Sequence, residues 1–207
     1  MKGLIFGPLG AGKGVQCRKL EKQEGVRHVE TGTILRENRE METPYGTPAD
    51  YIEAGDYVPD EVINEVVEQI LRDESRFILD GYPRTMSQVS YLSSITDLSV
   101  MVYMHVSDET TLNRLKNRQI CSSCNESYHE EYKPPAQTGQ CDSCAAPLVE
   151  RSDDDEEIIR HRIEVYKEKT VPVIEHYSDQ LDVISIDAER PHDVVWKELS
   201  SAIRPYL

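Results

Sequence analysis

The sequence of 207 residues predicts a three-layer α/β fold, in which helices cover both faces of a parallel sheet. Short apolar runs rich in β-branched residues alternate with helical patterns, and such runs are typical of strands buried on both faces. The strand candidates are residues 4–6, 77–79, 100–106 and 183–186. Because 38% of the residues are hydrophobic, the chain can bury the core of one compact domain with small inserted lobes.

The helices are predicted from apolar residues at three-to-four spacing. One amphipathic helix begins near Asp60, its candidate N-cap, and runs to about residue 71. A longer helix is expected over residues 153–177, with a kink at Pro172, and a terminal helix over residues 193–203. The alternation of these helices with the strands supports the layered fold.

Two stretches interrupt this alternation. Residues 30–58 contain several Pro and Gly turn signals and predict a small helical lobe. Residues 117–150 have almost no aliphatic core but hold two C-x-x-C pairs separated by 16 residues. The four cysteines are Cys121, Cys124, Cys141 and Cys144. This spacing favours a tetrahedral thiolate site for zinc or iron that staples the lobe.

Two other interpretations of the four cysteines remain. They could form a pair of redox disulfides, or a zinc ribbon that binds nucleic acid. The ribbon is disfavoured because Lys133 is the only lysine or arginine in residues 121–150. His129 is expected to pack beside Tyr128 rather than to bind metal, and the fifth cysteine, Cys17, is expected to be buried in the core.

The charge excludes several classes of function. The chain has 38 Asp and Glu against 23 Lys and Arg, a formal net charge of −15, so phosphate backbones and anionic lipids repel it. No apolar stretch approaches the ~20 residues of a membrane span, and the first apolar run is too short for a signal peptide. We therefore expect a cytoplasmic protein with no nucleic-acid or membrane partner.

A glycine-rich loop follows the first strand. Residues 7–14 read GPLGAGKG and are followed by a helical stretch. Such a turn directs backbone N–H groups and the helix dipole at one anion, and Lys13 adds a charge for the outer phosphates of a nucleotide. Gly14 follows Lys13, where the general pattern has Ser or Thr, so the loop lacks the hydroxyl that usually binds magnesium.

Three segments, in this order, resemble the signature segments of adenylate kinases: residues 7–14, residues 80–85 (DGYPRT), and residues 151–154 (RSDD) followed by Arg162. The resemblance extends over essentially the whole chain. It implies a P-loop nucleoside-kinase fold with a five-stranded parallel sheet, a helical AMP-binding lobe and a metal-stapled lid. The implied bounds are 30–58 for the AMP lobe, 117–154 for the lid, and 1–29, 59–116 and 155–207 for the core.

The resemblance also implies a reaction. Adenylate kinases transfer a phosphoryl group reversibly from ATP to AMP, giving two ADP, with Mg²⁺, and so maintain adenine nucleotide levels. Zinc is the implied structural metal of the lid, and a monomer is the implied assembly. Phosphoryl transfer between two anions needs positioning and charge neutralisation more than covalent chemistry, which explains why arginines dominate the matched positions.

The matched positions divide by substrate. The ATP-binding residues implied are Gly10, Ala11, Gly12, Lys13, Gly14, Val15, Arg114, Arg118, Ser127, Tyr128 and Arg190. The AMP-binding residues implied are Thr31, Arg36, Asp56, Tyr57, Val58, Gly81, Tyr82, Pro83, Arg84, Gln88, Arg151 and Arg162. The residues implied in the transfer itself are Lys13, Arg84, Arg118, Arg151, Arg162 and Asp80, the last as a carboxylate that holds Mg²⁺ through its water shell.

Three positions depart from the family pattern. Val15 replaces a threonine, Thr33 an aspartate and Leu9 a proline. One lost hydrogen-bond donor typically costs about 1–3 kcal/mol of binding. Two rival functions therefore stay open: a kinase for UMP, CMP or GMP on the same fold, and a catalytically weak nucleotide sensor or zinc-dependent interaction module.

The acidic balance is not required by this chemistry. If the arginines and Lys13 gather in one cleft, the remaining surface is even more acidic than the total charge implies. A strongly hydrated carboxylate surface suits a salt-rich cytoplasm, where screening suppresses its self-repulsion. The sequence therefore predicts a halophilic source.

Overall fold

The computed structural model describes residues 1–116, 118–151 and 153–207. In chain order the elements of the core and the first lobe are β1 (Lys2–Phe6), α1 (Lys13–Glu24), β2 (Arg27–Glu30), α2 (Thr31–Glu37), α3 (Pro48–Ala54), α4 (Asp60–Leu71), β3 (Phe77–Asp80), α5 (Met86–Ile95), β4 (Val100–His105) and α6 (Asp108–Leu115). They are followed by β5 (Gln119–Cys121), β6 (Ser127–Tyr128), β7 (Leu148–Glu150), α7 (Glu156–Val165), the π-helix η1 (Tyr166–Thr170), α8 (Val171–Ser178), β8 (Asp182–Asp187), α9 (His192–Ile203) and the 3₁₀ turn η2 (Arg204–Tyr206).

The central sheet has five parallel strands in the order β2-β3-β1-β4-β8, which confirms the predicted fold class. The apolar runs identified four of these strands. The fifth, β2, reads RHVE and carries too many polar residues to be recognised as a buried strand. It lies at the edge of the sheet, where charged side chains are tolerated because one side of the strand has no neighbouring strand.

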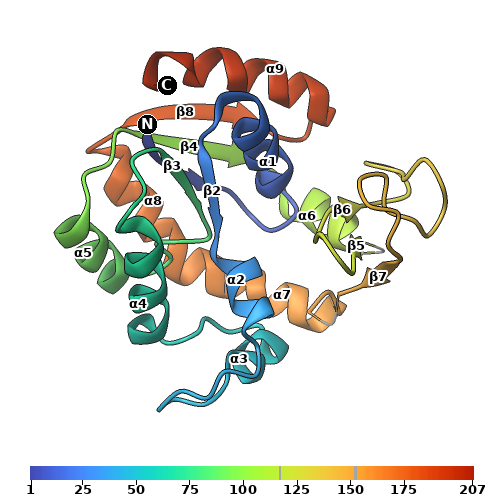
Figure 1. The fold of residues 1–207 in the computed structure, drawn as a ribbon, viewed down its shortest axis with the longest axis horizontal. Coiled ribbons are helices and arrows are strands. Elements are labelled where there is room, and N and C mark those ends of the chain that lie inside the picture. Colours follow the sequence, from blue (N-terminus) through green and yellow to red (C-terminus); the bar gives the residue numbers. More distant parts are fainter. Residues whose placement is uncertain (117, 152) are drawn as a thin grey trace.

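Helices cover both faces of the central sheet (Figure 1). Alternate residues of the strands face opposite layers. On one face Leu4 and Phe6 pack with α4, α5 and α8, and on the other Ile5 packs with α1 and α9. Leu4, Phe77, Leu79 and Met101 are 0% exposed, as expected for a sheet covered on both sides. The three layers therefore hold the sheet rigidly, and the loops at its ends are left to form the site.

The long helix expected over residues 153–177 is divided. Asp155 caps α7 by accepting a hydrogen bond from the N–H of Glu157, 2.9 Å away, so the helix begins at Glu156. The π-helix η1 then interrupts it directly before α8, with Pro172 in the first turn of α8. Because Pro172 has no N–H to donate, the regular ladder cannot continue through it, and the expected break is confirmed.

The helix predicted from Asp60 is α4, but Asp60 is not its N-cap. Pro59 occupies the cap position, and the carboxylate of Asp60 accepts hydrogen bonds from Thr85 Oγ1 (2.8 Å) and Gln88 Nε2 (2.6 Å). These two contacts tie α4 to the N-terminal end of α5. The carboxylate still lies in the first helical turn, where the helix dipole favours a negative charge.

Two lobes extend from the sheet. Helices α2 and α3 form the first, and α3 begins with a capping box between Thr47 and Asp50. The second contains β5, β6 and β7, an antiparallel sheet in the order β6-β5-β7. Its core is only Cys121, Tyr128 and Cys141 with Ala146 and Leu148 beside them, as its composition predicted. Residue 117, at the proposed start of the lid, lies outside the described residues.

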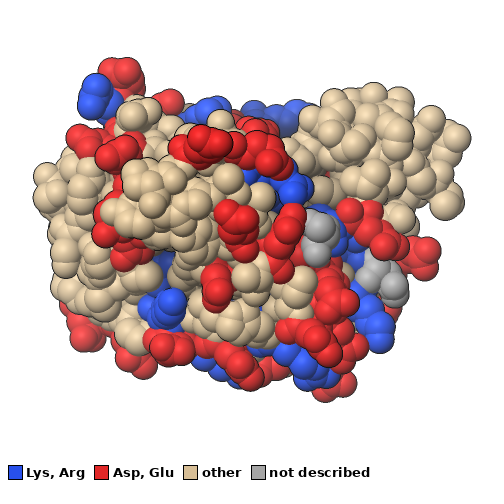
Figure 2. Space-filling model, turned by 90° about the horizontal axis from the view of Figure 1, so that it is seen from below, with Lys and Arg blue, Asp and Glu red and all other residues tan. Residues whose placement is uncertain are grey.

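The surface is strongly acidic but unevenly so. Figure 2 shows many carboxylates on the face seen from below, whereas the lobe at the right is mostly uncharged on this side. Residues 134–149 of that lobe include a single charged residue, Asp142. In the part of the chain that the structure describes, no helix is long and apolar enough to cross a membrane.

Candidate active site

The glycine-rich loop curls around the side chain that it presents. Lys13 Nζ donates hydrogen bonds to the carbonyl oxygens of Gly7 (2.8 Å) and Pro8 (3.0 Å). Gly7 has φ +151°, and a Cβ there would lie 2.6 Å from the carbonyl oxygen of Met104, so only glycine fits. Burial lowers the pKa of Lys13 from its ordinary value, although the carboxylate of Asp80 opposes that shift.

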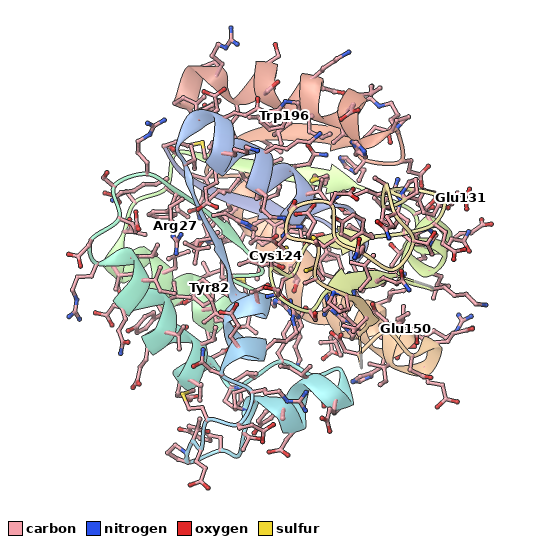
Figure 3. All side chains as sticks on the ribbon, turned by 45° about the vertical axis from the view of Figure 1, so that its right-hand side comes forward. Arg27, Tyr82, Cys124, Glu131, Glu150 and Trp196 are labelled. Carbon is pink, nitrogen blue, oxygen red and sulfur yellow. The ribbon has the colours of Figure 1, made fainter. Side chains whose placement is uncertain are left out.

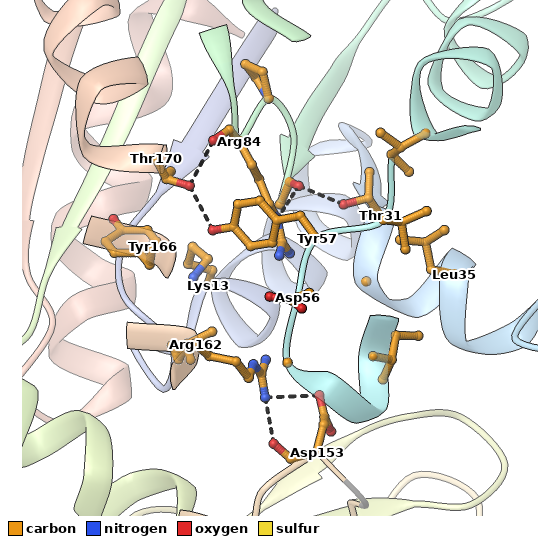
Figure 4. A pocket seen from close by; sticks show the side chains of 18 of the residues that line it. Lys13, Thr31, Leu35, Asp56, Tyr57, Arg84, Asp153, Arg162, Tyr166 and Thr170 are labelled. Atoms are coloured by element: carbon orange, nitrogen blue, oxygen red, sulfur yellow. Dashed lines mark hydrogen bonds and ion pairs between the residues drawn. The ribbon is translucent and has the colours of Figure 1, made fainter. Parts of the chain in front are cut away.

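Two cavities meet at this loop, and cationic side chains line both of them. The shared cations are Lys13, Arg36, Arg84 and Arg162. The smaller cavity is bounded by α2, α3, the loop after β3 and the π-helix (Figure 4). The larger one lies between the glycine-rich loop and the cysteine-containing lobe. This arrangement places positive charge between two spaces that could each receive an anion.

The smaller cavity is lined by all the residues expected on the AMP side except Tyr82 and Arg151. Tyr82 is 1% exposed and its hydroxyl donates to Asn64 Oδ1 over 2.6 Å, so its side chain belongs to the core. Arg151 lines the larger cavity instead. The ring of Tyr82 packs in the hydrophobic layer that α4, α5 and α8 form, so its side chain does not line this cavity, and its role toward AMP stays a prediction.

Hydrogen bonds to the loop after β3 shape this cavity. Thr31 Oγ1 donates to the carbonyl oxygen of Gly81 (2.9 Å), and Arg84 Nε donates to the same oxygen (2.7 Å). Gln88 Oε1 accepts from the N–H of Arg84 over 2.6 Å. Gly81 has φ +85°, and a Cβ there would lie 2.8 Å from Thr31 Oγ1, so the turn requires glycine.

Sequence reasoning missed the wall that the π-helix contributes. Thr170 Oγ1 donates to the carbonyl oxygen of Arg84 (3.2 Å) and therefore accepts from the hydroxyl of Tyr57 (2.9 Å), as Figure 4 shows. Tyr57 in turn lies under the guanidinium of Arg84, 4.8 Å from Cζ to the ring centre. Pro172 indicated an irregular helix, but no pattern indicated that Thr170 would point into a cavity.

The larger cavity is lined by all the residues expected on the ATP side, and also by Asp80. Arg114 donates from its two terminal nitrogens to the carbonyl oxygens of Gly10 and Glu189, at 3.2 Å each. It thereby links the glycine-rich loop to the segment after β8. Arg190 lies on that segment and pairs with Asp187 and Glu198.

Two adjacent carboxylates, Asp153 and Asp154, bind three of the arginines. Arg118 makes a bidentate pair with Asp154 at 2.7 and 2.6 Å, and Arg151 pairs with Asp153 through Nε at 2.7 Å. Arg162 Nη1 lies 3.0 Å from an oxygen of Asp153. Burial lowers the pKa of Arg162 to about 10, so the guanidinium keeps its charge at neutral pH. These carboxylates were not predicted as site residues, although they belong to the RSDD segment.

Asp80 ends β3 and is 5% exposed. Burial raises the pKa of such a carboxyl, but the contact with His28 and the charge of Lys13 outweigh burial and hold the pKa of Asp80 below its ordinary value. It is therefore an ionised carboxylate on the wall of the larger cavity. An ionised carboxylate on this wall suits Mg²⁺, which keeps most of its waters and takes few protein ligands.

The four lid cysteines lie together at the distances that a metal requires. Cys121 and Cys144 Sγ are 3.4 Å apart, Cys124 and Cys141 Sγ 3.6 Å, and Cys124 and Cys144 Sγ 3.7 Å. Sulfurs bound tetrahedrally at ~2.3 Å from zinc would be about 3.8 Å apart. The cluster consists of cysteines alone, and Figure 3 shows Cys124 on its loop. The residues thus fit the metal that the sequence predicted.

Each C-x-x-C pair forms the same turn. The N–H of Asn125 donates to the carbonyl oxygen of Cys121 (3.1 Å), and that of Ala145 to the carbonyl oxygen of Cys141 (2.9 Å). Asn125 and Ala145 both have positive φ, 57° and 59°. The two C-x-x-C pairs therefore share one backbone conformation, in which the residue after the second cysteine is left-handed.

Tyr128 supports the cysteine cluster more than it faces the cavity. It is 2% exposed, accepts a hydrogen bond from the N–H of Asp142 (2.8 Å) and lies 3.4 Å from the sulfur of Cys141. The hydrogen bond with Tyr128 lowers the pKa of Cys141 to about 6, which favours the thiolate that a metal binds. His129 is not part of the cluster; its ring lies 4.7 Å from that of Tyr132.

Asp153→Asn should weaken the acid sensitivity of the fold. The guanidinium of Arg151 outweighs burial and holds the pKa of Asp153 far below its ordinary value, so the unfolded chain binds the proton first as the pH falls. The stability that Asp153 contributes is complete above about pH 5 and decreases as the pH falls toward the native pKa.

Urea unfolding from about pH 6 to pH 3 tests this linkage. The unfolding free energy of the wild type should fall more steeply over this range than that of Asp153→Asn. Asp179→Asn, an exposed position at the end of α8, is the matched control and should follow the wild type. Equal slopes for all three proteins would contradict the assigned role of Asp153.

Comparison with known proteins agrees with this geometry. The family model described as "Adenylate kinase" matches residues 5–182. The adenylate kinases of Haloarcula marismortui and Halobacterium salinarum are 43% and 42% identical over 205 residues, which cover 97% of this chain and 95% of each relative. That of Petrotoga mobilis is 38% identical over 212 residues, covering 100% of this chain and 99% of the relative.

These identities extend over nearly the full length of both partners in each comparison. The matched region includes the glycine-rich loop, the turn after β3, the cysteine-containing lobe and the arginines that line both cavities. The chain therefore belongs to the adenylate kinase family.

Proposed function

We propose that this protein transfers a phosphoryl group reversibly between ATP and AMP, with the glycine-rich loop as the ATP site and the smaller cavity as the AMP site. The chain is a nucleoside monophosphate kinase, with ATP, AMP and ADP as its substrates and products. We assign the two sites because both cavities share the same four cations, Lys13, Arg36, Arg84 and Arg162. A phosphoryl group passing between them would meet cations along its whole path.

The residues divide the work by position. Gly10 to Val15 would bind the ATP phosphates through their N–H groups, and Lys13 would neutralise the outer ones. Thr31, Tyr57 and Gln88 would shape the AMP pocket, whose walls their hydrogen bonds define. Arg84 and Arg162 would bind the AMP and transferring phosphates, because a guanidinium can hold two phosphate oxygens at once.

Asp153 and Asp154 would hold the arginines in place for the phosphates. Each carboxylate binds a guanidinium group through two N–H donors, and a phosphate can bind the same donors. A nucleotide phosphate would therefore meet guanidinium groups that are already oriented. Arg118 and Arg151 flank the lid, and their charge would draw that lobe over the substrates. Closure excludes water, which would otherwise accept the phosphoryl group in place of AMP.

Adenylate kinases use Mg²⁺ with ATP, and Asp80 is the residue we assign to hold it. The ion supplies charge neutralisation on the phosphate oxygens when bound. Asp80 is ionised, faces the larger cavity and lies at the end of a central strand, where its position is fixed. Val15 and Thr33 line the same cavity and offer fewer polar contacts there than the family pattern does.

We further propose that the lid extends over residues 117–154, that the AMP lobe extends over residues 30–58, and that zinc bound by Cys121, Cys124, Cys141 and Cys144 stabilises the lid. The sulfur separations and the two equivalent turns support a closed four-thiolate site. All four ligands come from the protein, so this metal would stabilise the fold and take no part in the transfer. We expect a cytoplasmic monomer without nucleic-acid or membrane partners.

The acidic surface is proposed to be an adaptation to salt. The net charge is −15, and Haloarcula marismortui and Halobacterium salinarum supply two of the similar adenylate kinases. Repulsion among the carboxylates would destabilise the fold in dilute buffer and would be screened at high ionic strength.

Nucleotide specificity can be measured directly. Initial rates of transfer from ATP–Mg²⁺ to AMP, UMP, CMP and GMP should be highest with AMP. Faster turnover with another monophosphate would favour that kinase, and absence of turnover with all four would favour a sensor.

Lys13→Met should lower kcat by at least about 100-fold, because a preorganised charge on the transferring phosphates is lost. Lys22→Met, on the exposed face of the same helix, is the matched control and should keep the wild-type rate. A wild-type kcat in Lys13→Met would exclude Lys13 from the transfer.

Cys124→Ser should lower the metal content of the purified protein and make residues 118–151 sensitive to protease. Ser123→Ala, in the same turn, should change neither. Elemental analysis and limited proteolysis measure the two effects. A wild-type protein that contains neither zinc nor iron in stoichiometric amount would refute the lid site.

The unfolding free energy, measured with urea, should increase when KCl is raised from dilute to molar concentration. A protein that is equally stable in dilute buffer would show that its surface is not adapted to salt.

A further inference from the structure

Three side chains meet beneath the glycine-rich loop, and the proposed reaction does not require them as a group. Cys17 comes from α1, His28 from β2 and Asp80 from β3. A thiol sulfur, a ring nitrogen and a carboxylate oxygen from the three residues all lie within 4.8 Å of one another. Cys17 is 1% exposed, and the side chains of His28 and Asp80 are 5% and 7% exposed. The three groups therefore form a buried cluster in the core.

The imidazole of His28 faces the carboxylate of Asp80. Its Nε2 is buried and lies 3.4 Å from Asp80 Oδ2, an ion pair that does not meet the geometry of a hydrogen bond. Nitrogen and oxygen ligands bound tetrahedrally to one metal at ~2.0–2.2 Å would lie about 3.4 Å apart, which is the separation of these two atoms, and the sulfur of Cys17 lies within 4.8 Å of both.

We propose that Cys17, His28 and Asp80 form a second metal site, which binds a soft divalent cation such as Zn²⁺. Thiolate, imidazole and carboxylate are the three donor types that Zn²⁺ takes in proteins, whereas Mg²⁺ takes oxygen. Three protein ligands leave a fourth position open. Asp80 lines the larger cavity, so water or a phosphate oxygen can reach that position from there.

Binding involves a proton exchange that balances without another reactant. Burial raises the pKa of Cys17, so the thiol keeps its proton at neutral pH and releases it to solvent when the sulfur binds the cation. His28 binds through a neutral ring nitrogen and releases its second proton in the same way. No atom changes its oxidation state when the cation binds.

Occupation of this site has a consequence that rests on the proposed function. Asp80 cannot hold the hydrated Mg²⁺ of ATP while it is bound to a soft cation. Zn²⁺ at Cys17, His28 and Asp80 therefore inhibits the kinase even when Mg²⁺ is in excess. The inhibition arises in the core. It is independent of the four-cysteine lid, because the two groups of metal ligands are separate.

Metal counting on the full chain tests the site without any assay of activity. The protein with its lid loaded with one Zn²⁺ is titrated with further Zn²⁺, and bound metal is measured after removal of the excess. The wild type should bind two ions per chain. His28→Gln and Cys17→Ala should each bind one, and His176→Gln, a control on α8 far in sequence from the cluster, should bind two.

A spectroscopic measurement keeps the test valid if a core variant fails to fold. Co²⁺ added to wild-type protein with a zinc-loaded lid should produce the charge-transfer absorption of a single thiolate, well below that of a four-thiolate site. A wild type that binds one ion only, and shows no such band, overturns the proposal and leaves the cluster as a buried ion pair. Two ions in both core variants also overturn it.

Inhibition is measured separately. Zn²⁺ in excess over the lid site should lower the rate of transfer to AMP in the wild type at saturating Mg²⁺, and Cys17→Ala should lose that sensitivity. If the metal counts hold but no monophosphate is a substrate, the site stands and the proposed function fails. If AMP turns over and the second ion is absent, the function stands and the site fails.

Discussion

Arg36, Arg118, Arg151 and Arg162 gather where the two cavities meet, and the site depends on holding these like charges together at low exposure. Repulsion between them strengthens as water is excluded, and buried charges persist only when they are paired. Asp153 and Asp154 supply that pairing for Arg118, Arg151 and Arg162 from one short segment between the lid and α7, and Glu30 supplies it for Arg36. Their oxygens orient the guanidinium groups in the geometry that phosphates require, so the pairing that stabilises the fold also prepares the site.

The parallel sheet explains why the remaining groups arrive at the same place. The C-terminal ends of the parallel strands β1, β3 and β8 lie on one side of the sheet. Lys13, the turn from Asp80 to Arg84, and Arg190 lie at or just after these ends. In an open α/β sheet, ligands bind at the C-terminal ends of the strands, because the loops there converge while the strands stay fixed. A strongly acidic chain thus brings several of its cations into one cleft, whereas many carboxylates lie on its surface (Figure 2).

The lid obeys a different constraint. Its core contains Cys121, Tyr128 and Cys141 and little else, so burial of apolar surface cannot stabilise it alone. The two C-x-x-C turns replace that missing core with a cluster of sulfurs, and Tyr128 connects the second turn to the small sheet. None of the four cysteines lines either cavity, so the cluster stabilises the lobe from outside the candidate site.

The sequence by itself determined four of the five strands, the glycine-rich loop and the cysteine cluster, and every nucleotide-site residue that it indicated except Tyr82 lines one of the two cavities. These features are local: periodicity reports how a stretch is buried, and fixed spacings report a turn or a metal site. Only the tertiary structure decided the rest. The strand β2 is polar because it lies at an edge, Thr170 reaches the cavity through a π-helix, and Tyr82 turns into the core. Cys17, His28 and Asp80 meet although they belong to three elements, because contacts between distant residues are fixed by how the layers pack.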